Sequence, residues 1–226
     1  MDIIWYGHSY FQIEGKTEQG RVVLAIDPFD KSVGLKPKKT KAHILLLSHN
    51  HKDHANKQVV SAIFGEEKKE NLFVLDEPGE YEIKGVKIKG VPSFHDKKQG
   101  EERGENVIFL IEIENIKVCH MGDFGEGELS NQQAEEIVGV DVLLIPVGGK
   151  FTINGKEAAK IVSQAEPKIV IPMHYKTKEV LLDIENENSF LNFIGVKEKE
   201  KIKKLKIKKG ELERKEGTEI IVMEKN

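Results

Sequence analysis

Apolar residues along the chain fall into short blocks, separated by charged and turn-forming segments. Blocks of this length that are continuously apolar or alternate with polar residues are typical of β-strands, and the glycines and prolines between them are typical of turns. In the first half, the pattern predicts strands over Asp2–Tyr6, Ser9–Ile13, Val22–Ile26, His43–Ser48, Leu72–Leu75, Glu80–Ile83 and Val86–Val91. In the second half, it predicts strands over Val107–Ile113, Ile116–Met121, Asp141–Val147, Lys168–Pro172, Lys203–Lys208 and Thr218–Met223.

Helical periodicity and charged loops separate these strands. The pattern predicts helices over about His54–Phe64, Ser130–Val138 and Lys156–Gln164, and exposed loops over Asp30–Lys41 and Asp96–Asn106. The strands His43–Ser48 and Asp141–Val147 are almost continuously apolar, which is typical of a sheet with both faces covered. Buried strands that alternate with helices indicate an α/β layered fold. No repeat or low-complexity linker interrupts the sequence, so we expect one domain over residues 1–226.

Composition and charge narrow the classes of protein to which the chain can belong. The 226 residues include 35 Lys and Arg against 38 Asp and Glu, a net charge of −3 that argues against a general grip on nucleic acid. The single cysteine, Cys119, excludes an internal disulfide framework and is typical of a reducing, cytoplasmic setting. No apolar segment approaches the ~18 residues of a membrane span, and the N-terminus lacks signal-peptide features. We expect a cytoplasmic protein with no membrane partner, and a homo-oligomer stays open.

The strongest chemical signal is a cluster of potential metal ligands after the strand His43–Ser48. The segment Ser48–His54 reads SHNHKDH and contains His49, His51, Asp53 and His54. Side chains two positions apart in extended backbone point the same way, so His49 and His51 can bind one ion together. Asp53 and His54 follow where the chain turns, so they can reach a second position nearby. The alternative is a polar turn with solvated histidines, but so dense a cluster after an apolar strand favours metal binding.

Three further candidates also follow predicted strands. They are His95, Asp123 and His174, and Gly122 permits a close backbone approach beside Asp123. Each of these residues alone is more often a surface or core residue than a ligand. Ligands in open α/β folds gather beyond the carboxyl ends of strands, so the three residues extend the cluster to a seven-ligand set for two ions.

These motifs together carry a family resemblance. Five strings support it: AIDPF with Asp27, SHNHKDH, VPSFHD with His95, MGD with Asp123, and IPMHY with His174. The sequence resembles the metallo-β-lactamase-fold hydrolase superfamily over nearly its whole length. Within it, GHSYF, PGEYEI and IPVGGKFTINGKEAA make it most similar to the small single-domain group related to ascorbate-6-phosphate lactonase. The resemblance implies a four-layer αββα sandwich with the site at one edge between the sheets.

The resemblance also implies how the ligands are divided. The first ion would be bound by His49, His51 and His95, the second by Asp53, His54 and His174, with Asp123 bridging both. Asp27 would steady the histidine loop, although a role as a strand-end turn former fits it as well. His43 and His120 are expected to be packing residues. His8, in GHSYF, either packs or lines the pocket, and we favour packing.

The expected chemistry is metal-assisted hydrolysis. Two cations ~3.5–4 Å apart can hold a bridging water and lower its pKa from about 15.7 toward ~7, so that hydroxide exists at neutral pH. Asp53 and His54 are the expected catalytic residues, and Asp53 can accept a proton from the water. Histidine and carboxylate ligands suit zinc best, and manganese, iron and nickel also fit. The expected substrate is a small ester, a lactone or a phosphate-containing molecule.

Two other functions remain open on the sequence. A phosphodiesterase or ribonuclease would need a local basic groove despite the net charge, so nucleic acid is a disfavoured partner. The other is a metal-binding or regulatory module that keeps the metal ligands but does not catalyse a reaction. Lysines in the loops Asp30–Lys41 and Asp96–Asn106, with Lys150 and Lys176, would suit an anionic small molecule, unless they are simply solvated.

Overall fold

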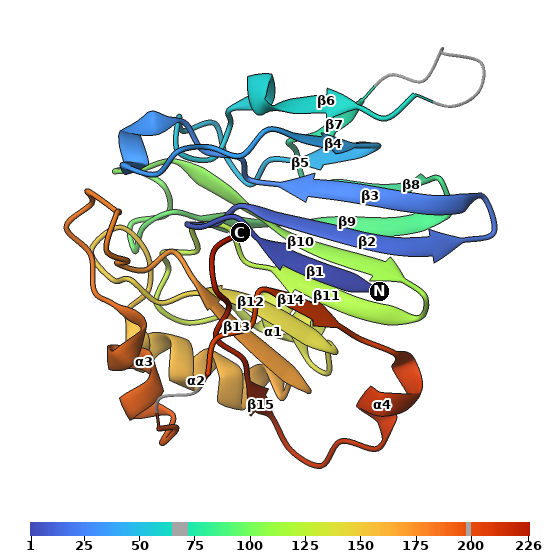
Figure 1. Cartoon of the computed structure of the whole chain (residues 1–226). Coiled ribbons are helices and arrows are strands. Elements are labelled where there is room, and N and C mark those ends of the chain that lie inside the picture. The colour runs from blue at the N-terminus through green and yellow to red at the C-terminus, as the bar shows by residue number, and fades with distance from the viewer. Residues whose placement is uncertain (65–71, 198–199) are drawn as a thin grey trace.

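Two β-sheets packed face to face form the centre of the molecule (Figure 1). The computed structural model describes residues 1–64, 72–197 and 200–226. The six-stranded sheet has the order β14-β1-β2-β3-β5-β7, and the seven-stranded sheet has the order β15-β13-β12-β11-β10-β9-β8. Strands β4 and β6 pair separately.

The element bounds follow the predicted strands closely. The six-stranded sheet contains β1 (Asp2–Trp5), β2 (Phe11–Thr17), β3 (Gly20–Ile26), β5 (Ile44–Leu46), β7 (Phe73–Leu75) and β14 (Lys204–Lys206). The seven-stranded sheet contains β8 (Gly79–Ile83), β9 (Val86–Phe94), β10 (Glu105–Ile113), β11 (Ile116–His120), β12 (Val142–Pro146), β13 (Ile169–Met173) and β15 (Glu219–Ile220). The remaining elements are β4 (Thr40–Ala42), β6 (Val60–Ala62), α1 (Asn131–Ile137), α2 (Gly155–Ala165), α3 (Glu187–Phe193), α4 (Lys209–Glu213) and 3₁₀ turns at Lys31–Val33 and Lys57–Val59.

Strand β3 shows why its sequence is continuously apolar. Val22, Leu24 and Ile26 belong to the core between the two large sheets, whereas Val23 and Ala25 belong to a second core on the outer face. Successive side chains of a strand point to opposite faces, so a strand buried on both sides has no polar face. Both faces of the six-stranded sheet are therefore covered.

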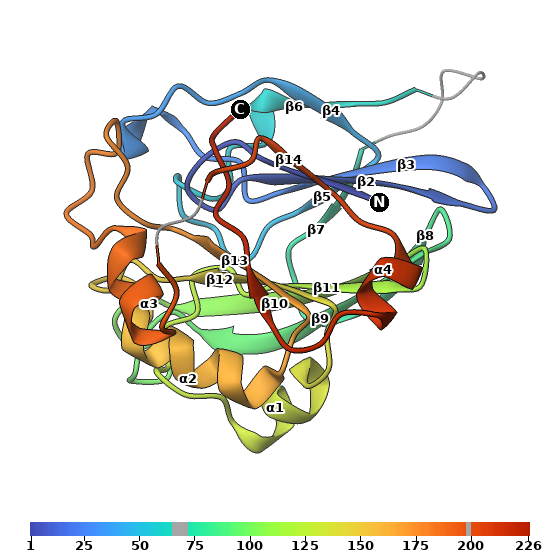
Figure 2. The ribbon, with the colours of Figure 1, turned by 60° about the horizontal axis from the view of Figure 1, so that its bottom comes forward.

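Different elements cover the two outer faces. Helices α1, α2 and α3 lie against the seven-stranded sheet, and the β4–β6 pair lies on the other side of the molecule, over the six-stranded sheet (Figure 2). Helices α1 and α2 begin at capping boxes built by Ser130 with Gln133 and by Asn154 with Glu157. The predicted α/β sandwich of two sheets is confirmed; of the two outer helical layers of the predicted αββα arrangement, α1, α2 and α3 form one, and the β4–β6 pair lies on the other side.

The helix predicted over His54–Phe64 is wrong. That stretch forms the 3₁₀ turn Lys57–Val59 and then β6, which pairs in parallel with β4 at the end of the predicted loop Asp30–Lys41. Val60 is buried in the outer core, so a β-branched residue at this position gains more from strand pairing than from a helix. Helices α3 and α4 were not predicted, because alternating charges hide their few buried residues.

Strand direction brings the candidate residues to one edge. In the six-stranded sheet, β1, β3 and β5 run the same way, and in the seven-stranded sheet β9, β11, β12 and β13 do. The segments after these strands meet across the sandwich, where the His174 amide donates to the His8 carbonyl at 3.1 Å and the Val107 amide donates to the Ser48 carbonyl at 2.8 Å. In the described ranges, no α-helix has the length and apolarity needed to cross a membrane.

Candidate metal centre

A buried carboxylate holds the histidine loop to the end of β3. Asp27 accepts hydrogen bonds from the Ser48 amide at 2.7 Å, from the Ser48 hydroxyl at 2.6 Å and from His54 Nδ1 at 3.0 Å. These bonds link the first and last residues of the SHNHKDH segment and direct His54 Nε2 toward the site. The supporting role expected for Asp27 is confirmed, since it does more than form a strand-end turn.

Three histidines form the first ligand group. His49 and His51 from the loop after β5 and His95 from the end of β9 each offer one nitrogen, and these nitrogens lie within 4.8 Å of one another. The ring centroids are separated by 4.7 Å for His49 and His51, 4.9 Å for His49 and His95, and 5.3 Å for His51 and His95. His49 and His95 are buried, but His51 is exposed, so this group is open to solvent on one side.

The second ligand group contains Asp53, His54 and His174, together with His8. One donor atom from each of the four lies within 4.8 Å of the others. The structure places the fully buried ring of His8 among the predicted ligands, so of the two roles expected for His8 it favours lining the site over packing alone. The signal was available in GHSYF, since His8 follows β1 just as the other candidates follow their strands.

Asp123 lies between the two groups. Its Oδ1 is 3.1 Å from His54 Nε2, and its Oδ2 is 3.1 Å from both His95 Nε2 and His174 Nε2. The Asp123 amide donates to Asn106 Oδ1 at 2.9 Å, which fixes the backbone that carries the carboxylate. One carboxylate therefore faces ligands of both groups, as a bridging ligand would.

Gly122 makes the close approach of this segment possible. It has a φ of +56°, and a Cβ there would lie 2.3 Å from Asn106 Oδ1 and 2.5 Å from Ser48 Cβ. Any larger residue would have to displace either the partner of Asp123 or the first residue of the histidine loop. The expected role of Gly122 in close backbone approach is confirmed.

Burial and neighbouring charges set the protonation of the site. Burial lowers the pKa of both His8 and His49 to about 3, so their imidazoles are neutral at pH 7. Burial would lower the pKa of His54 as well, but Asp123 and Asp27 raise it well above 6.5. Burial would raise the pKa of Asp123, but His174 and His54 hold it well below its usual range. Neutral His8 and His49 and ionised Asp123 are in the forms that bind a metal ion, whereas His54 would release a proton on binding one.

The donor atoms at the centre of the site fit divalent cations. Among the described residues, His49 Nε2, His54 Nε2 and Asp123 Oδ1 are buried and form no hydrogen bond, although the last two atoms lie 3.1 Å apart. Buried polar atoms are normally satisfied, so their convergence at one place indicates a shared ligand. Imidazole nitrogens with a few carboxylates suit zinc and other first-row metal ions.

A cavity of about 540 Å³ opens beside the first group. His49, Asn50 and His51 line one side, and Phe94 and Arg103 belong to the opposite strand end and loop. The loop Asp96–Asn106 thus borders the site through its last residues, as expected. Asp76, Glu77 and Glu105 also line this cavity, so its walls carry both signs of charge.

The lysines expected near the ions are engaged elsewhere. Lys150 Nζ pairs with Asp183 at 2.6 Å, and Lys176 Nζ donates to the Leu182 carbonyl at 2.6 Å. No residue of the loop Asp30–Lys41 is among the described residues that line the cavity. Positive charge at the cavity wall comes instead from Arg103.

Two other histidines have structural roles, as expected. His120 Nε2 donates to the Ser9 carbonyl at 3.0 Å, and its Nδ1 accepts from the Gly122 amide at 3.1 Å. His43 Nδ1 accepts from the Val23 amide at 3.0 Å. Hydrogen bonds occupy both nitrogens of His120, which therefore has no lone pair for an ion.

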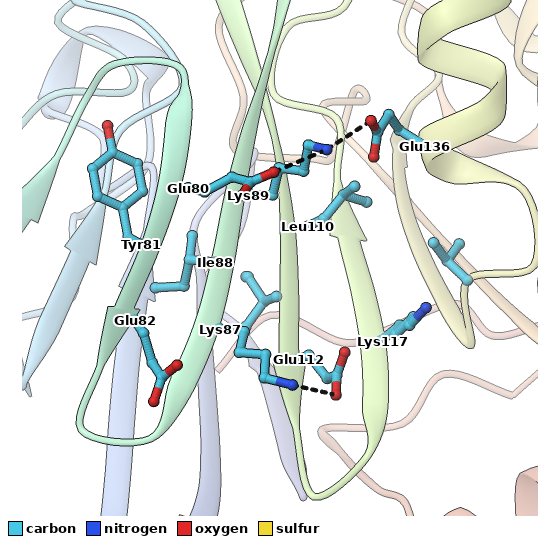
Figure 3. A pocket seen from close by; sticks show the side chains of 12 residues that line it. Glu80, Tyr81, Glu82, Lys87, Ile88, Lys89, Leu110, Glu112, Lys117 and Glu136 are labelled. Carbon is cyan, nitrogen blue, oxygen red and sulfur yellow. Dashed lines mark hydrogen bonds and ion pairs between the residues drawn. The ribbon is translucent and has the colours of Figure 1, made fainter.

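A second cavity, of about 470 Å³, lies on the outer face of β8, β9 and β10 (Figure 3). Most of its charged side chains are paired with each other: Lys89 contacts Glu80 and Glu136, and Lys87 contacts Glu112. No histidine lines it among the described residues, so it lacks the chemistry found at the edge between the sheets.

Comparison with known proteins supports the family resemblance indicated by the sequence motifs. Residues 2–174 match the family model for a beta-lactamase superfamily domain. The sequence is 34% identical over 194 residues to a UPF0173 metal-dependent hydrolase of Thermococcus onnurineus, which covers 76% of this chain and 83% of that protein. It is 30% identical over 200 residues to a UPF0173 metal-dependent hydrolase of Methanopyrus kandleri, with 78% and 85% covered.

Solved structures of similar fold point to the same superfamily. A Thermotoga maritima protein proposed to be a Zn-dependent hydrolase of the metallo-β-lactamase superfamily superposes with a TM-score of 0.76 and 34% identity, covering 98% of this chain and 97% of that one. The metallo hydrolase Igni18 of Ignicoccus hospitalis superposes with a TM-score of 0.62 at 19% identity, covering 92% and 99%. The second likeness concerns the fold alone.

Proposed function

The chain belongs to the metallo-β-lactamase superfamily of metal-dependent hydrolases, and we propose that it binds two divalent ions, zinc first among them, to hydrolyse a small ester, lactone or phosphate-containing substrate. The observation that carries this proposal is Asp123, whose two oxygens face His54 on one side and His95 and His174 on the other at 3.1 Å. A carboxylate shared in this way is suited to joining two ions.

We assign His49, His51 and His95 to the first ion and Asp53, His54 and His174 to the second, with Asp123 common to both. When bound, a pair of divalent ions supplies a nucleophile from water at neutral pH and polarises the oxygen of the substrate. Residues 1–226 would form one hydrolase domain around this site. The resemblance to the ascorbate-6-phosphate lactonase group is the reason to include lactones.

Asp53 and His54 are the residues that we propose to act in catalysis. Burial would raise the pKa of Asp53, but His8 and His54 lower it, so the carboxylate is ionised at neutral pH, as a proton acceptor must be, and is a weak base while these neighbours surround it. About a quarter of its side chain is exposed (27%), so it is reachable from solvent. Asp27 holds His54 in place from the other side of the ring.

The cavity supports a small molecule better than a polyanion. Its volume of about 540 Å³ is in the range of sites for small ligands. Asp76, Glu77 and Glu105 would repel the phosphates of a nucleic acid, whereas Arg103 can still bind one anionic group. Turnover of single-stranded RNA in preference to small esters would favour the phosphodiesterase alternative.

Metal analysis and activity profiling test the proposal together. Protein purified without chelator should contain two equivalents of metal and should hydrolyse at least one compound of a panel of lactones, phosphate monoesters, phosphodiesters and carboxylic esters. His51→Ala should lose this activity, and Lys52→Ala, an exposed neighbour outside both groups, should retain it. Metal-replete protein inert toward the whole panel would contradict the proposed substrate class.

A further inference from the structure

His8 is held rigidly at the site by its own backbone. Its φ of +53° lies in the left-handed region, which residues other than glycine adopt only under strain. Its carbonyl accepts from Trp5 Nε1 at 2.9 Å and from the His174 amide at 3.1 Å. Strained backbone of this kind persists only where surrounding contacts determine it, and here those contacts fix the His8 ring beside His174.

The ring of His8 has the spacing of a fellow ligand. Its centroid is 4.9 Å from that of His54, within the 4.7–5.3 Å found in the three-histidine group, and at 4.1 Å it is closer still to that of His174. His8 Nε2 is 3.5 Å from Asp53 Oδ2. This distance is long for a hydrogen bond, but donor atoms about 2.0–2.2 Å from one tetrahedral ion are separated by about this much.

Both ring nitrogens of His8 lack a hydrogen-bond partner among the described residues, although the side chain is fully buried. A packing histidine at this edge looks different, since His120 has hydrogen bonds at both of its nitrogens. A buried imidazole beside a carboxylate and two histidines, with no hydrogen-bond partner at either nitrogen among the described residues, is placed to donate a lone pair.

We propose that His8 is a metal ligand that completes the second site with Asp53, His54 and His174; this inference rests on the dinuclear function proposed above. The second ion is then enclosed by four protein ligands besides Asp123. The first ion, beside the exposed His51 and the 540 Å³ cavity, keeps the open position. A substrate would then approach from the side of His51 and the cavity, and the four ligands of the second group besides Asp123 would hold its ion the more tightly.

Two variants separate ligation from the simpler role of positioning Asp53. Asparagine tolerates the left-handed backbone but is too short to reach the ion, so His8→Asn removes the ligand with little backbone strain. Glutamine can still donate a hydrogen bond to Asp53 but is a poor ligand for zinc, so His8→Gln preserves positioning alone. His43→Asn is the matched control: a buried histidine outside both groups whose Nδ1 acceptor asparagine can replace.

The effect is measured by titrating zinc into metal-free protein in the presence of a competing chelator. Absorption of the Co(II)-loaded protein is a second readout. Loss of a direct ligand should exceed the 10–100-fold typical of indirect support, so both His8 variants should weaken one of two equivalents by at least about 100-fold and change the Co(II) spectrum. His43→Asn should match the wild type. Wild-type affinity in His8→Asn would overturn the inference, and wild-type affinity in His8→Gln alone would reduce His8 to a positioning residue, which also overturns it.

Failure of the proposed function gives a different result. Wild-type protein that binds only one equivalent would contradict the dinuclear proposal whatever the variants do. His8 would then stand as a ligand if His8→Asn weakens that single equivalent and fall if it does not. Circular dichroism of each chelated variant checks its folding, and His8→Gln serves if His8→Asn does not fold.

Discussion

Replacing Asp27 by asparagine tests how far the histidine loop depends on the carboxylate that holds it. Asp27 Oδ2 accepts from both the Ser48 hydroxyl and His54 Nδ1, and Oδ1 accepts from the Ser48 amide. Asparagine keeps the volume and tolerates the φ of +49° found at this position. It can keep one acceptor only, so the bonds on the other side must reverse or break.

The expected cost follows from these contacts. A lost hydrogen bond to a charged group is worth about 1.5–3 kcal/mol, and the Ser48 hydroxyl can reorient to accept, so about one such bond is lost from the chelated protein. At about 2–4 °C per kcal/mol for a chain of this size, Tm should fall by about 3–12 °C. The misaligned His54 should also weaken zinc binding by about 10–100-fold.

Thermal unfolding of the chelated protein and zinc competition titration measure the two effects. Asp30→Asn is the control, because among the described residues the Asp30 side chain accepts only from Ser32 in its own 3₁₀ turn, and asparagine keeps the backbone bond from the Asp30 amide to the Lys52 carbonyl. Its zinc affinity should equal that of the wild type. Asp27→Asn protein that keeps wild-type zinc affinity within twofold would refute the role of Asp27 in orienting His54.

Three further outcomes are expected. Burial lowers the pKa of His8 and His49 to about 3, against 6.5 when exposed, so below pH 6.5 the unfolded chain binds protons that the folded protein does not, and stability is lost down to about pH 3. Between pH 6 and 4, these two histidines alone should lower the free energy of unfolding of the metal-free protein by up to about 2.7 kcal/mol per pH unit in urea titrations, and a flat profile would contradict buried neutral imidazoles. Gly122→Ala should destabilise the protein by about 2 kcal/mol more than Gly139→Ala, whose φ is also positive but whose surroundings are open; equal urea midpoints would show that contact is unimportant. Arg103→Ala should raise KM for an anionic ester while leaving KM for its neutral analogue unchanged; equal effects on both would remove Arg103 from substrate binding.

Much of the sandwich could be predicted because its strands are buried on both faces. Val22–Ile26 and Asp141–Val147 read as strands for that reason, and the structure places β3 and β12 there. The helix prediction over His54–Phe64 was wrong, because the pairing of β6 with β4 depends on residues about twenty positions earlier in the chain. The local pattern of apolar residues does not indicate such a distant strand partner.

A candidate ligand could be predicted from the sequence where it follows a strand and where other candidate ligands stand in the same cluster or at the same kind of position. His49 and His51 are identified by the dense cluster to which they belong. His95, Asp123 and His174 each follow a strand in the same way. His8 obeys the same rule, but a lone histidine after a strand is ordinarily a packing residue. Only the meeting of β1 with β13 across the two sheets, through the bond between His174 and His8, shows that it belongs with the others.

The most direct test of the dinuclear centre is anomalous X-ray diffraction at the zinc edge from crystals of zinc-loaded protein. Two peaks about 3.5–4 Å apart are expected, one within bonding distance of His49, His51 and His95 and the other within bonding distance of Asp53, His54 and His174. Asp123 should contact both ions. A single peak, or a second peak away from Asp123, would contradict the two-ion site.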